Sequence, residues 1–253
     1  MNDLSAFIEK ISSALPSENQ KNFLKRVWSG DSSRYAARIQ ALGFENMAEV
    51  LDAGCGYGQW SMCLAKLNTQ ISACDYDPLR INIAEQIATR LGHGNIKFDS
   101  SSIENLPYKN ESFDGVFSYS VLYLSDYKKS LEEFRRVLKP GGLLYFSTNG
   151  LGWYLYNLIE THNDSDDFSS RQMAADTLAN TLNYHNTGTT PPGASLVMPK
   201  DVIIPYLADH GWEVLASGPD GSLHADKHRT APFYANKSYC GYETVWEALC
   251  RKK

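Results

Sequence analysis

The chain has 253 residues, of which 43% are hydrophobic and 12% aromatic, so it can bury a core and is not a disordered chain. Its 24 Lys and Arg against 29 Asp and Glu give a net charge of −5, which disfavours nucleic acid as a partner. No apolar run approaches the roughly 18 residues of a membrane helix, and the N-terminus lacks a secretory h-region, so we expect a cytoplasmic protein without membrane contact.

The first fifty residues predict three helices. Apolar residues recur with a 3.6-residue period from Leu4 to Leu15, and Pro16 ends that segment. Further helical stretches are expected at 17–28 and 33–42, the second ended by Gly43. We therefore expect residues 1–47 to form a helical cap.

From residue 49 onward, strands and helices alternate. Strands are expected at 49–53, 71–74, 95–98, 113–118 and 143–147, and helices at 60–67, 78–91 and 126–138. Such alternation predicts a mostly parallel sheet with helices on both faces. Residues 48–150 are thus the expected binding core, because ligands bind such sheets at the carboxyl ends of the strands.

The remainder contains two long polar segments. An insert at 151–199 has expected helices at 153–160 and 171–182. In 200–253 we expect a helix at 200–210, a strand at 212–216, a loop at 218–240 and a last strand at 242–249. Loops this long usually carry function, so both polar segments should cover the carboxyl ends of the strands. We interpret the whole of 1–253 as one domain.

The most informative stretch follows the first strand and reads Val50-Leu51-Asp52-Ala53-Gly54-Cys55-Gly56-Tyr57-Gly58. Glycines let the backbone turn tightly near a ligand, and the next helix offers its N-terminus to a negative group. Asp75 closes the second strand 21 residues after Gly54, where a carboxylate can accept from two ribose hydroxyls. A dinucleotide site would need a glycine where Gln59 stands. A nucleoside without pyrophosphate, such as S-adenosylmethionine, is favoured.

This stretch resembles motif I of the class I S-adenosylmethionine-dependent methyltransferases. The resemblance spans about 48–150 and includes Asp75-Tyr76-Asp77-Pro78, Ile103-Glu104-Asn105-Leu106-Pro107, Ser112-Phe113-Asp114 and Leu138-Lys139-Pro140-Gly141-Gly142. It implies a Rossmann-like α/β fold with a seven-stranded, mostly parallel sheet. The strand at 242–249 would be the antiparallel one.

The resemblance also implies the residues that hold S-adenosylmethionine. The methionyl side would be lined by Asp52, Gly54, Cys55 and Gly56, and flanked by Ser118 and Tyr119. Asp75 would bind the ribose and Tyr76 would lie against the adenine. Ser102 stands where the family often has an acid that reads the adenine amino group, and the Ile103 backbone could read the ring. Tyr35 and Arg38 are candidates for the methionyl carboxylate, with ordinary helix surface as the alternative.

The acceptor side is expected among aromatic and histidine residues over the strand ends. The candidates for binding the acceptor are Tyr123, Trp153, Tyr156, Tyr184 and His228. A histidine is the expected general base because its pKa lies near neutrality, and the candidates are His185, His162 and His224. Such a lining suits a small polar organic acceptor, for example a sugar or a natural-product intermediate.

Two further patterns narrow the chemistry. Enzymes that methylate exocyclic or amide nitrogens often carry Asp/Asn-Pro-Pro-Tyr after the fourth strand, where this chain has Ser118-Tyr119-Ser120-Val121. The five cysteines include no CxxC, and the acidic stretch 163–167 lacks the glycine and later glutamate of a calcium loop. We therefore expect reduced thiols and no bound metal.

The sequence thus predicts an S-adenosylmethionine-dependent methyltransferase that acts on a hydroxyl of a small molecule. Two alternatives stay open: N-methylation of an amino sugar or amine, and an S-adenosylmethionine-binding module without catalysis. A nicotinamide-dependent reductase is a distant fourth, because the third glycine and a Tyr-x-x-x-Lys motif are missing. No pattern indicates an oligomeric state.

Overall fold

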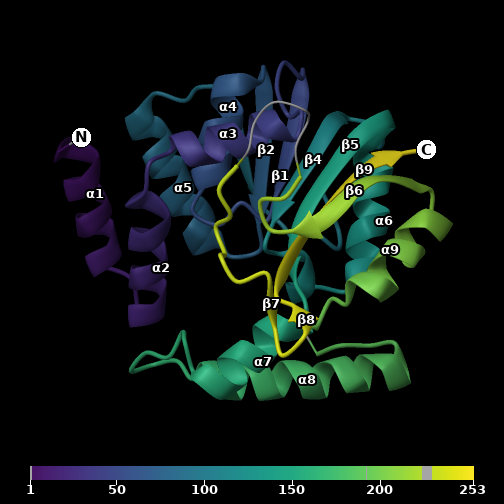
Figure 1. Cartoon of the computed structure of the whole chain (residues 1–253). Coiled ribbons are helices and arrows are strands. Elements are labelled where there is room, and N and C mark those ends of the chain that lie inside the picture. The colour runs from purple at the N-terminus through teal and green to yellow at the C-terminus, as the bar shows by residue number, and fades with distance from the viewer. Residues whose placement is uncertain (1, 192, 224–229) are drawn as a thin grey trace.

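The computed structural model describes residues 2–191, 193–223 and 230–253 (Figure 1). His224 and His228, expected as base and acceptor-binding residue, lie outside the described residues. Within the described ranges, no helix is long and apolar enough to cross a membrane.

A seven-stranded sheet forms the centre of the molecule, in the order β3-β2-β1-β4-β5-β9-β6. Its strands are β1 (Glu49–Ala53), β2 (Gln70–Asp75), β3 (Ile96–Ser100), β4 (Phe113–Tyr119), β5 (Leu138–Asn149), β6 (Trp212–Pro219) and β9 (Val245–Lys252). Strands β1 to β5 pair in parallel, and β9 is antiparallel to both β5 and β6. The expected Rossmann-like sheet with one antiparallel strand is confirmed.

Three strands differ most from the sequence prediction. β5 begins at Leu138, so it includes the Lys-Pro-Gly-Gly turn, and β6 continues to Pro219 past a register shift between Val214 and Ala216. The last sheet strand begins at Val245. The residues before it form a separate two-stranded ribbon, β7 (Ser238–Tyr239) with β8 (Tyr242–Glu243). Local apolar patterning does not fix these ends, because cross-strand partners set them.

Helices cover both faces of the sheet. Side chains alternate between the two faces along each strand, so neighbouring residues of one strand enter different cores. Val50 belongs to a core with residues of α3 (Ser33–Ala41) and α4 (Gln59–Leu67), whereas Leu51 belongs to a core with residues of α6 (Tyr127–Val137) and α9 (Lys200–Asp209). Both residues are fully buried, as expected for a parallel strand covered on two sides. The connection from β3 to β4, residues 101–112, forms no helix.

The N-terminal helices pack beside the turn that follows β1. After α1 (Asn2–Ser13), Ser17 caps α2 (Glu18–Trp28) by accepting from the Gln20 N–H, and the buried Leu24 shares a core with Tyr57 and residues of α5 (Pro78–Leu91). The Trp28 indole N–H donates to the Tyr57 carbonyl at 3.2 Å. The cap therefore touches the glycine-rich turn itself.

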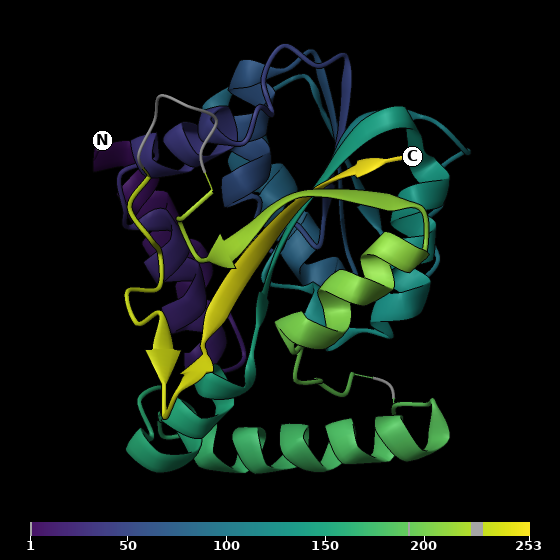
Figure 2. The same cartoon turned by 45° about the vertical axis from the view of Figure 1, so that its right-hand side comes forward.

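The insert lies beneath the carboxyl ends of the strands, as Figures 1 and 2 both show. α7 (Leu151–Glu160) starts directly after β5, α8 (Ser170–Thr187) packs against it, and a short 3-10 helix (Leu122–Leu124) follows β4. Gly152 lets α7 approach the β7–β8 ribbon closely, because a Cβ there would overlap the Tyr242 carbonyl oxygen. This placement brings the insert to the edge at which such sheets bind ligands.

Candidate active site

The glycine-rich turn and Asp75 form one hydrogen-bonded unit. The N–H groups of Gly54 and Cys55 donate to the Cys74 carbonyl at 2.8 Å, and the Gly56 N–H donates to Asp75 Oδ2 at 2.9 Å. The Asp77 N–H donates to Asp75 Oδ1 at 3.0 Å. A carboxylate offers about four acceptor positions, so these two bonds leave room for two ribose hydroxyls.

Gly54 is required at its position for two reasons. Its φ is +82°, in the left-handed region, and a Cβ there would overlap a methyl group of Val121. Val121 comes directly after Ser120, which itself has a φ of +60° at the end of β4. Strained backbone of this kind gathers at functional sites, and here it joins the ends of β1 and β4.

Asp52 is a buried carboxyl behind the turn, with 1% of its surface exposed. Burial raises its pKa to about 7, the Ser61 hydroxyl opposes this by donating a hydrogen bond at 2.5 Å, and nearby Asp75 adds to the rise. A carboxyl with this pKa is about half ionised at neutral pH. It can therefore lose its proton when a cationic group arrives.

The adenine-side candidates lie beside Asp75. Tyr76 is 81% exposed, so its ring is free to cover a base, whereas Ile103 is buried. The Ser102 Oγ accepts from the Glu104 N–H at 3.1 Å, which leaves its second lone pair available to accept from an adenine amino group. These placements are compatible with nucleoside binding.

Ser118 and Tyr119, at the end of β4, point to different partners. The buried Ser118 hydroxyl donates to the Ala53 carbonyl at 3.0 Å, so it ties β4 to β1. The Tyr119 ring packs on Trp60 at 4.7 Å, and its hydroxyl donates to Asp220 Oδ1 at 3.3 Å. Ser118 is thus committed to the backbone of the fold.

Arg38 is neither helix surface nor a free cation, which corrects both expectations for it. Its guanidinium is fully buried and pairs with Asp220 at 2.9 Å and Glu247 at 2.7 Å, and we call these three residues the buried charge cluster. Burial acts to lower the pKa of Arg38, but Tyr145 and the two acids raise it above its usual value overall. With both carboxylates on Nη1, the guanidinium is not open to a methionyl carboxylate.

Tyr35 is half-buried. Its ring lies edge-on to Trp60 at 4.7 Å and 4.9 Å from the ring of Phe233, and its hydroxyl donates to the Val27 carbonyl. Burial raises the pKa of Tyr35. Sequence reasoning missed Asp220, Glu247 and Phe233 in this neighbourhood. Glu247 had a signal, since it is an acid within an apolar strand, but Asp220 beside a glycine resembles any polar turn.

The acceptor-side residues fall into two groups. Five rings meet beneath the strand ends and form what we call the aromatic cluster: Trp153, Tyr156, His162, Tyr234 and Tyr239. Tyr184 lies instead with Tyr127 and Lys128 of α6, and His185 is exposed on α8. The structure therefore brings together three of the expected residues and keeps Tyr184 and His185 apart from them.

Tyr123 stands between the ends of β4 and β5. Burial raises its pKa, and interactions with the side chains of Ser120 and Asn149 lower it. Its carbonyl accepts from the Leu196 N–H at 2.8 Å, which fastens the end of the insert there. Tyr123 thus lies near the strained Ser120.

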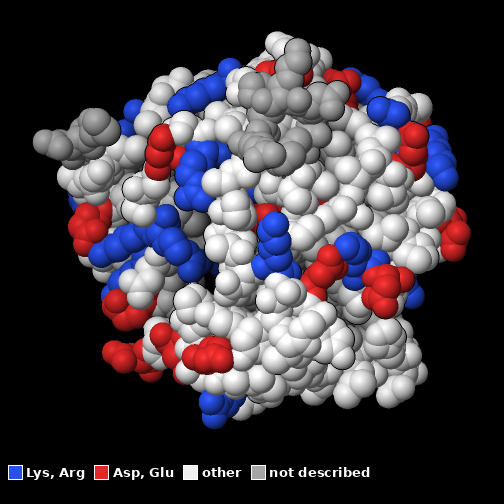
Figure 3. Space-filling model, viewed as in Figure 1, with Lys and Arg blue, Asp and Glu red and all other residues white. Residues whose placement is uncertain are grey.

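The insert and the N-terminal cap meet at this edge. Figure 3 shows basic side chains gathered over the N-terminal helices and acidic ones below them, on the insert. The Asn19 N–H donates to Asp167 Oδ2 at 3.4 Å. A carboxylate at the start of α2 is favoured by the helix dipole, so this contact joins the insert to the cap.

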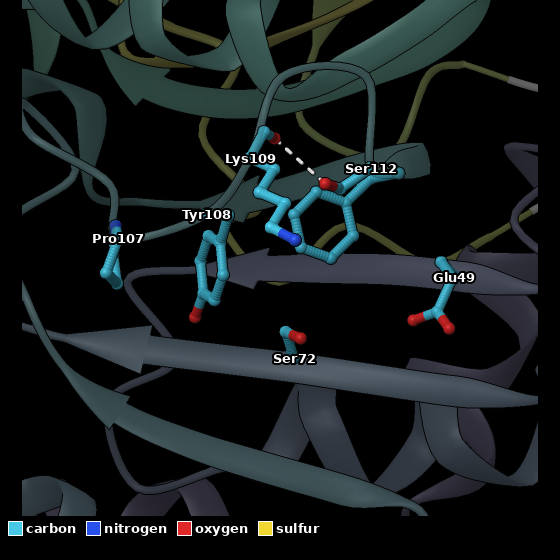
Figure 4. Close-up of a pocket in the computed structure, with 7 residues that line it drawn as sticks. Glu49, Ser72, Pro107, Tyr108, Lys109 and Ser112 are labelled. Carbon is cyan, nitrogen blue, oxygen red and sulfur yellow. Dashed lines mark hydrogen bonds between the residues drawn. The ribbon is translucent and has the colours of Figure 1, made fainter.

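A separate cavity of about 430 Å³ opens at the opposite edge of the sheet. It is lined by Glu49 and Phe113, which begin β1 and β4, by Ser72 of β2, and by the 101–112 connection. Figure 4 shows Tyr108 and Lys109 reaching over the strands from that connection. Because it lies at the amino ends of the strands, this cavity is not part of the candidate site.

Comparison with known proteins connects this geometry to a chemistry. Residues 50–142 match the model of a family described as a methyltransferase domain. An uncharacterized methyltransferase, YodH of Bacillus subtilis (strain 168), is 40% identical over 95 residues, which are 38% of this chain and 40% of that protein. The malonyl-[acyl-carrier protein] O-methyltransferase of Erwinia billingiae (strain Eb661) is 31% identical over 144 residues, 56% of this chain and 53% of that protein.

A solved structure resembles almost the whole chain. The crystal structure of a SAM-dependent methyltransferase from Aquifex aeolicus aligns over 98% of both chains, with a TM-score of 0.56 and 17% identity. At that identity the likeness concerns the fold. The chain spans about half the length, or less, of the two curated relatives.

Proposed function

We propose, from the match of residues 50–142 to a methyltransferase domain, that the protein is a class I S-adenosylmethionine-dependent methyltransferase that methylates a hydroxyl of a small organic acceptor. A sugar or a natural-product intermediate is the acceptor class that we propose. The name of the Erwinia billingiae relative, an O-methyltransferase, supports oxygen as the acceptor atom.

One observation carries the cofactor half of the proposal. Two backbone N–H groups donate to the Asp75 carboxylate and leave its other acceptor positions free for ligand hydroxyls. Asp75 lies between the glycine-rich turn and the exposed Tyr76. Asp52, with its pKa of about 7, stands behind the same turn and can meet the methionyl ammonium as a carboxylate. These residues fit S-adenosylmethionine in charge and in hydrogen-bonding capacity.

The bound cofactor supplies a methyl group on a sulfonium, so its leaving-group chemistry needs no help from the chain. The protein's task is to hold the acceptor atom in line, and positioning of this kind is worth up to about 7–11 kcal/mol of barrier. We assign that task to the aromatic cluster and Tyr123. His162, whose ring lies 5.1 Å from that of Tyr156, is the histidine we propose as general base.

An amine acceptor is the second candidate, and the aromatic cluster is the observation that favours it. Tyrosine and tryptophan faces attract ammonium groups, and the cluster lies next to a carboxylate because Tyr239 donates to Glu160 Oε1 at 2.6 Å. Product analysis distinguishes the two. Purified protein with methyl-labelled S-adenosylmethionine should label hydroxylated sugars rather than amines if the first proposal holds.

The decisive experiment is calorimetric titration with S-adenosylhomocysteine. We expect wild type to bind and Asp75→Ala to bind about 100-fold more weakly, because hydrogen bonds to a charged group contribute about 1.5–3 kcal/mol each. Asp77→Ala is the matched control. It removes the N-cap of α5 and a half-exposed ion pair with Arg80, which together cost about 1 kcal/mol of stability, and it should bind normally. If wild type binds neither S-adenosylhomocysteine nor S-adenosylmethionine, the proposal is wrong.

A further inference from the structure

Asp220 joins two parts of the molecule that the sequence keeps far apart. It follows β6, is 4% exposed, and uses each carboxylate oxygen toward a different region. Oδ1 accepts from Arg38 at 2.9 Å and from the Tyr119 hydroxyl at 3.3 Å. Oδ2 accepts from the backbone N–H groups of Phe233 at 2.6 Å and Tyr234 at 2.9 Å.

The residues that Oδ2 holds belong to a segment we call the strap, residues 230–236. The strap has no helix or strand of its own, and its chain is held by side chains from elsewhere. Arg38 donates to the Thr230 hydroxyl and to the Ala231 carbonyl, both at 3.1 Å, and Arg34 donates to the Pro232 carbonyl at 3.1 Å. Since the strap lacks a backbone ladder, Asp220 supplies two of its fixed points.

The two residues that Asp220 Oδ2 holds, Phe233 and Tyr234, pack their rings against different partners. Phe233 packs against Tyr35, Trp60 and Tyr119, with centroid distances of 4.9, 5.4 and 5.7 Å. Tyr234 stands edge-on to Trp153 at 4.7 Å and belongs to the aromatic cluster. Trp60 comes two residues after Gly58 of the glycine-rich turn. One carboxylate oxygen therefore fixes a contact on the cofactor side and a contact on the acceptor side at the same time.

We propose that Asp220 is a positioning residue that couples the cofactor side of the site to the acceptor side through the strap. Cofactor bound at the ends of β1 and β4 would restrict the motion of Tyr119, Trp60 and Phe233. Because Asp220 holds the backbone of both Phe233 and Tyr234, it would thereby restrict Tyr234 and the wall of the acceptor pocket as well. The inference rests on the proposed function for its cofactor, but the anchoring of the strap by Asp220 stands independently of any ligand.

Two amide variants separate this role from general support of the fold. The side chain that Asp220→Asn introduces has one oxygen, so whichever way it turns, its NH2 meets either Arg38 or the two N–H groups of the strap. Glu247→Gln is the matched control. Glu247 is similarly buried and has the same partner Arg38, but it contacts Tyr145 and the Leu223 N–H rather than the strap.

The test is hydrogen–deuterium exchange of peptides covering 230–236, with and without S-adenosylhomocysteine. Without ligand, we expect Asp220→Asn to exchange at least tenfold faster than wild type, and Glu247→Gln to stay within about threefold, because Asp220, unlike Glu247, accepts from strap amides. With ligand, exchange of the strap should slow in wild type and in Glu247→Gln but not in Asp220→Asn. Equal exchange in the two variants, or a strap that is indifferent to bound ligand, overturns the proposal.

Phe233→Ala keeps the experiment informative if Asp220→Asn fails to fold. This change leaves the ion pairs of the buried charge cluster and the Phe233 N–H in place. It removes the ring from its cofactor-side contacts and from beneath the Arg34 and Arg38 guanidinium groups, which lie 4.8 and 5.3 Å from the ring centre. The strap should keep its protection without ligand and lose the further slowing by S-adenosylhomocysteine. Calorimetry on the same samples reports ligand binding separately. Failure of wild type to bind would count against the proposed function, whereas normal binding with an unchanged ligand response in Phe233→Ala would count against the coupling.

Discussion

The two halves of the candidate site are built in different ways. The cofactor side consists of a turn and an acid that hydrogen-bond to one another within about 25 residues of chain, from Asp52 to Asp77. The acceptor side, together with the strap and the buried charge cluster that holds the strap, draws Arg38, Trp153, Asp220 and Tyr234 from the cap, the insert and two C-terminal segments. The family match at 50–142 contains the first half and excludes nearly all of the second. A short local unit can be shared among relatives with different acceptors, whereas the long-range half is free to differ.

Removing the central cation of the long-range half should have the largest effect. Arg38→Met leaves Asp220 and Glu247 buried without a counter-charge, which should lower the free energy of unfolding by about 3–5 kcal/mol. Urea denaturation measures this. Arg34→Met is the control, since Arg34 is exposed and should cost less than about 1 kcal/mol. Comparable losses in the two variants would show that the charge cluster does not organise this half.

The loss of stability in Arg38→Met should also depend on pH, in a direction that the pKa of Glu247 determines. Burial raises the pKa of Glu247 in the folded state, and loss of Arg38 should raise it further. A carboxyl whose pKa is raised by folding favours the folded state at low pH, and this contribution is lost as pH rises through the folded-state pKa. The deficit of Arg38→Met relative to wild type should therefore be smaller at pH 5 than at pH 8. A deficit that grows toward pH 5 would contradict this assignment.

Within the local half, two glycines can be set against each other. Gly54 and Gly56 both have positive φ, but only at Gly54 would a Cβ meet another residue, Val121. Gly54→Ala should lower stability by about 2–4 kcal/mol through strain and overpacking, and Gly56→Ala by about 1–2 kcal/mol through strain alone. Thermal or urea unfolding measures both. If Gly56→Ala is the more harmful, contact between the ends of β1 and β4 does not shape the turn.

The smallest expected effect is the pH dependence of cofactor binding. The pKa of Asp52 is about 7, so about a tenth of it is ionised at pH 6. A methionyl ammonium favours the ionised form, so affinity for S-adenosylhomocysteine should rise about tenfold between pH 6 and pH 8 and then level off. Calorimetry at several pH values measures this. Asp52→Asn should show no such rise, and an equal affinity of wild type at both pH values would remove Asp52 from the methionyl side.

The turn, its acid and the sheet were predictable for a physical reason. Val50 and Leu51 are apolar because both faces of β1 are covered, and the positive φ of Gly54 and Gly56 reflects a backbone geometry that favours glycine. Arg38 was placed on a helix correctly and given the wrong environment. The helix that carries Arg38 depends on neighbouring residues, but the acids that pair with Arg38 lie more than 180 residues away in the chain.

The sequence by itself determined the α/β alternation, the glycine-rich turn and the carboxylate at the end of β2, because each depends on residues that are close in the chain. Only the tertiary structure decided which of the aromatic and histidine residues meet. Trp153 and Tyr156 contact Tyr234 of the strap, and His162 contacts Tyr156. Tyr184 and His185 lie apart from them, near the end of α8. Those contacts depend on how the insert, the strap and the cap pack over the strand ends, and no local pattern encodes a packing between segments so far apart.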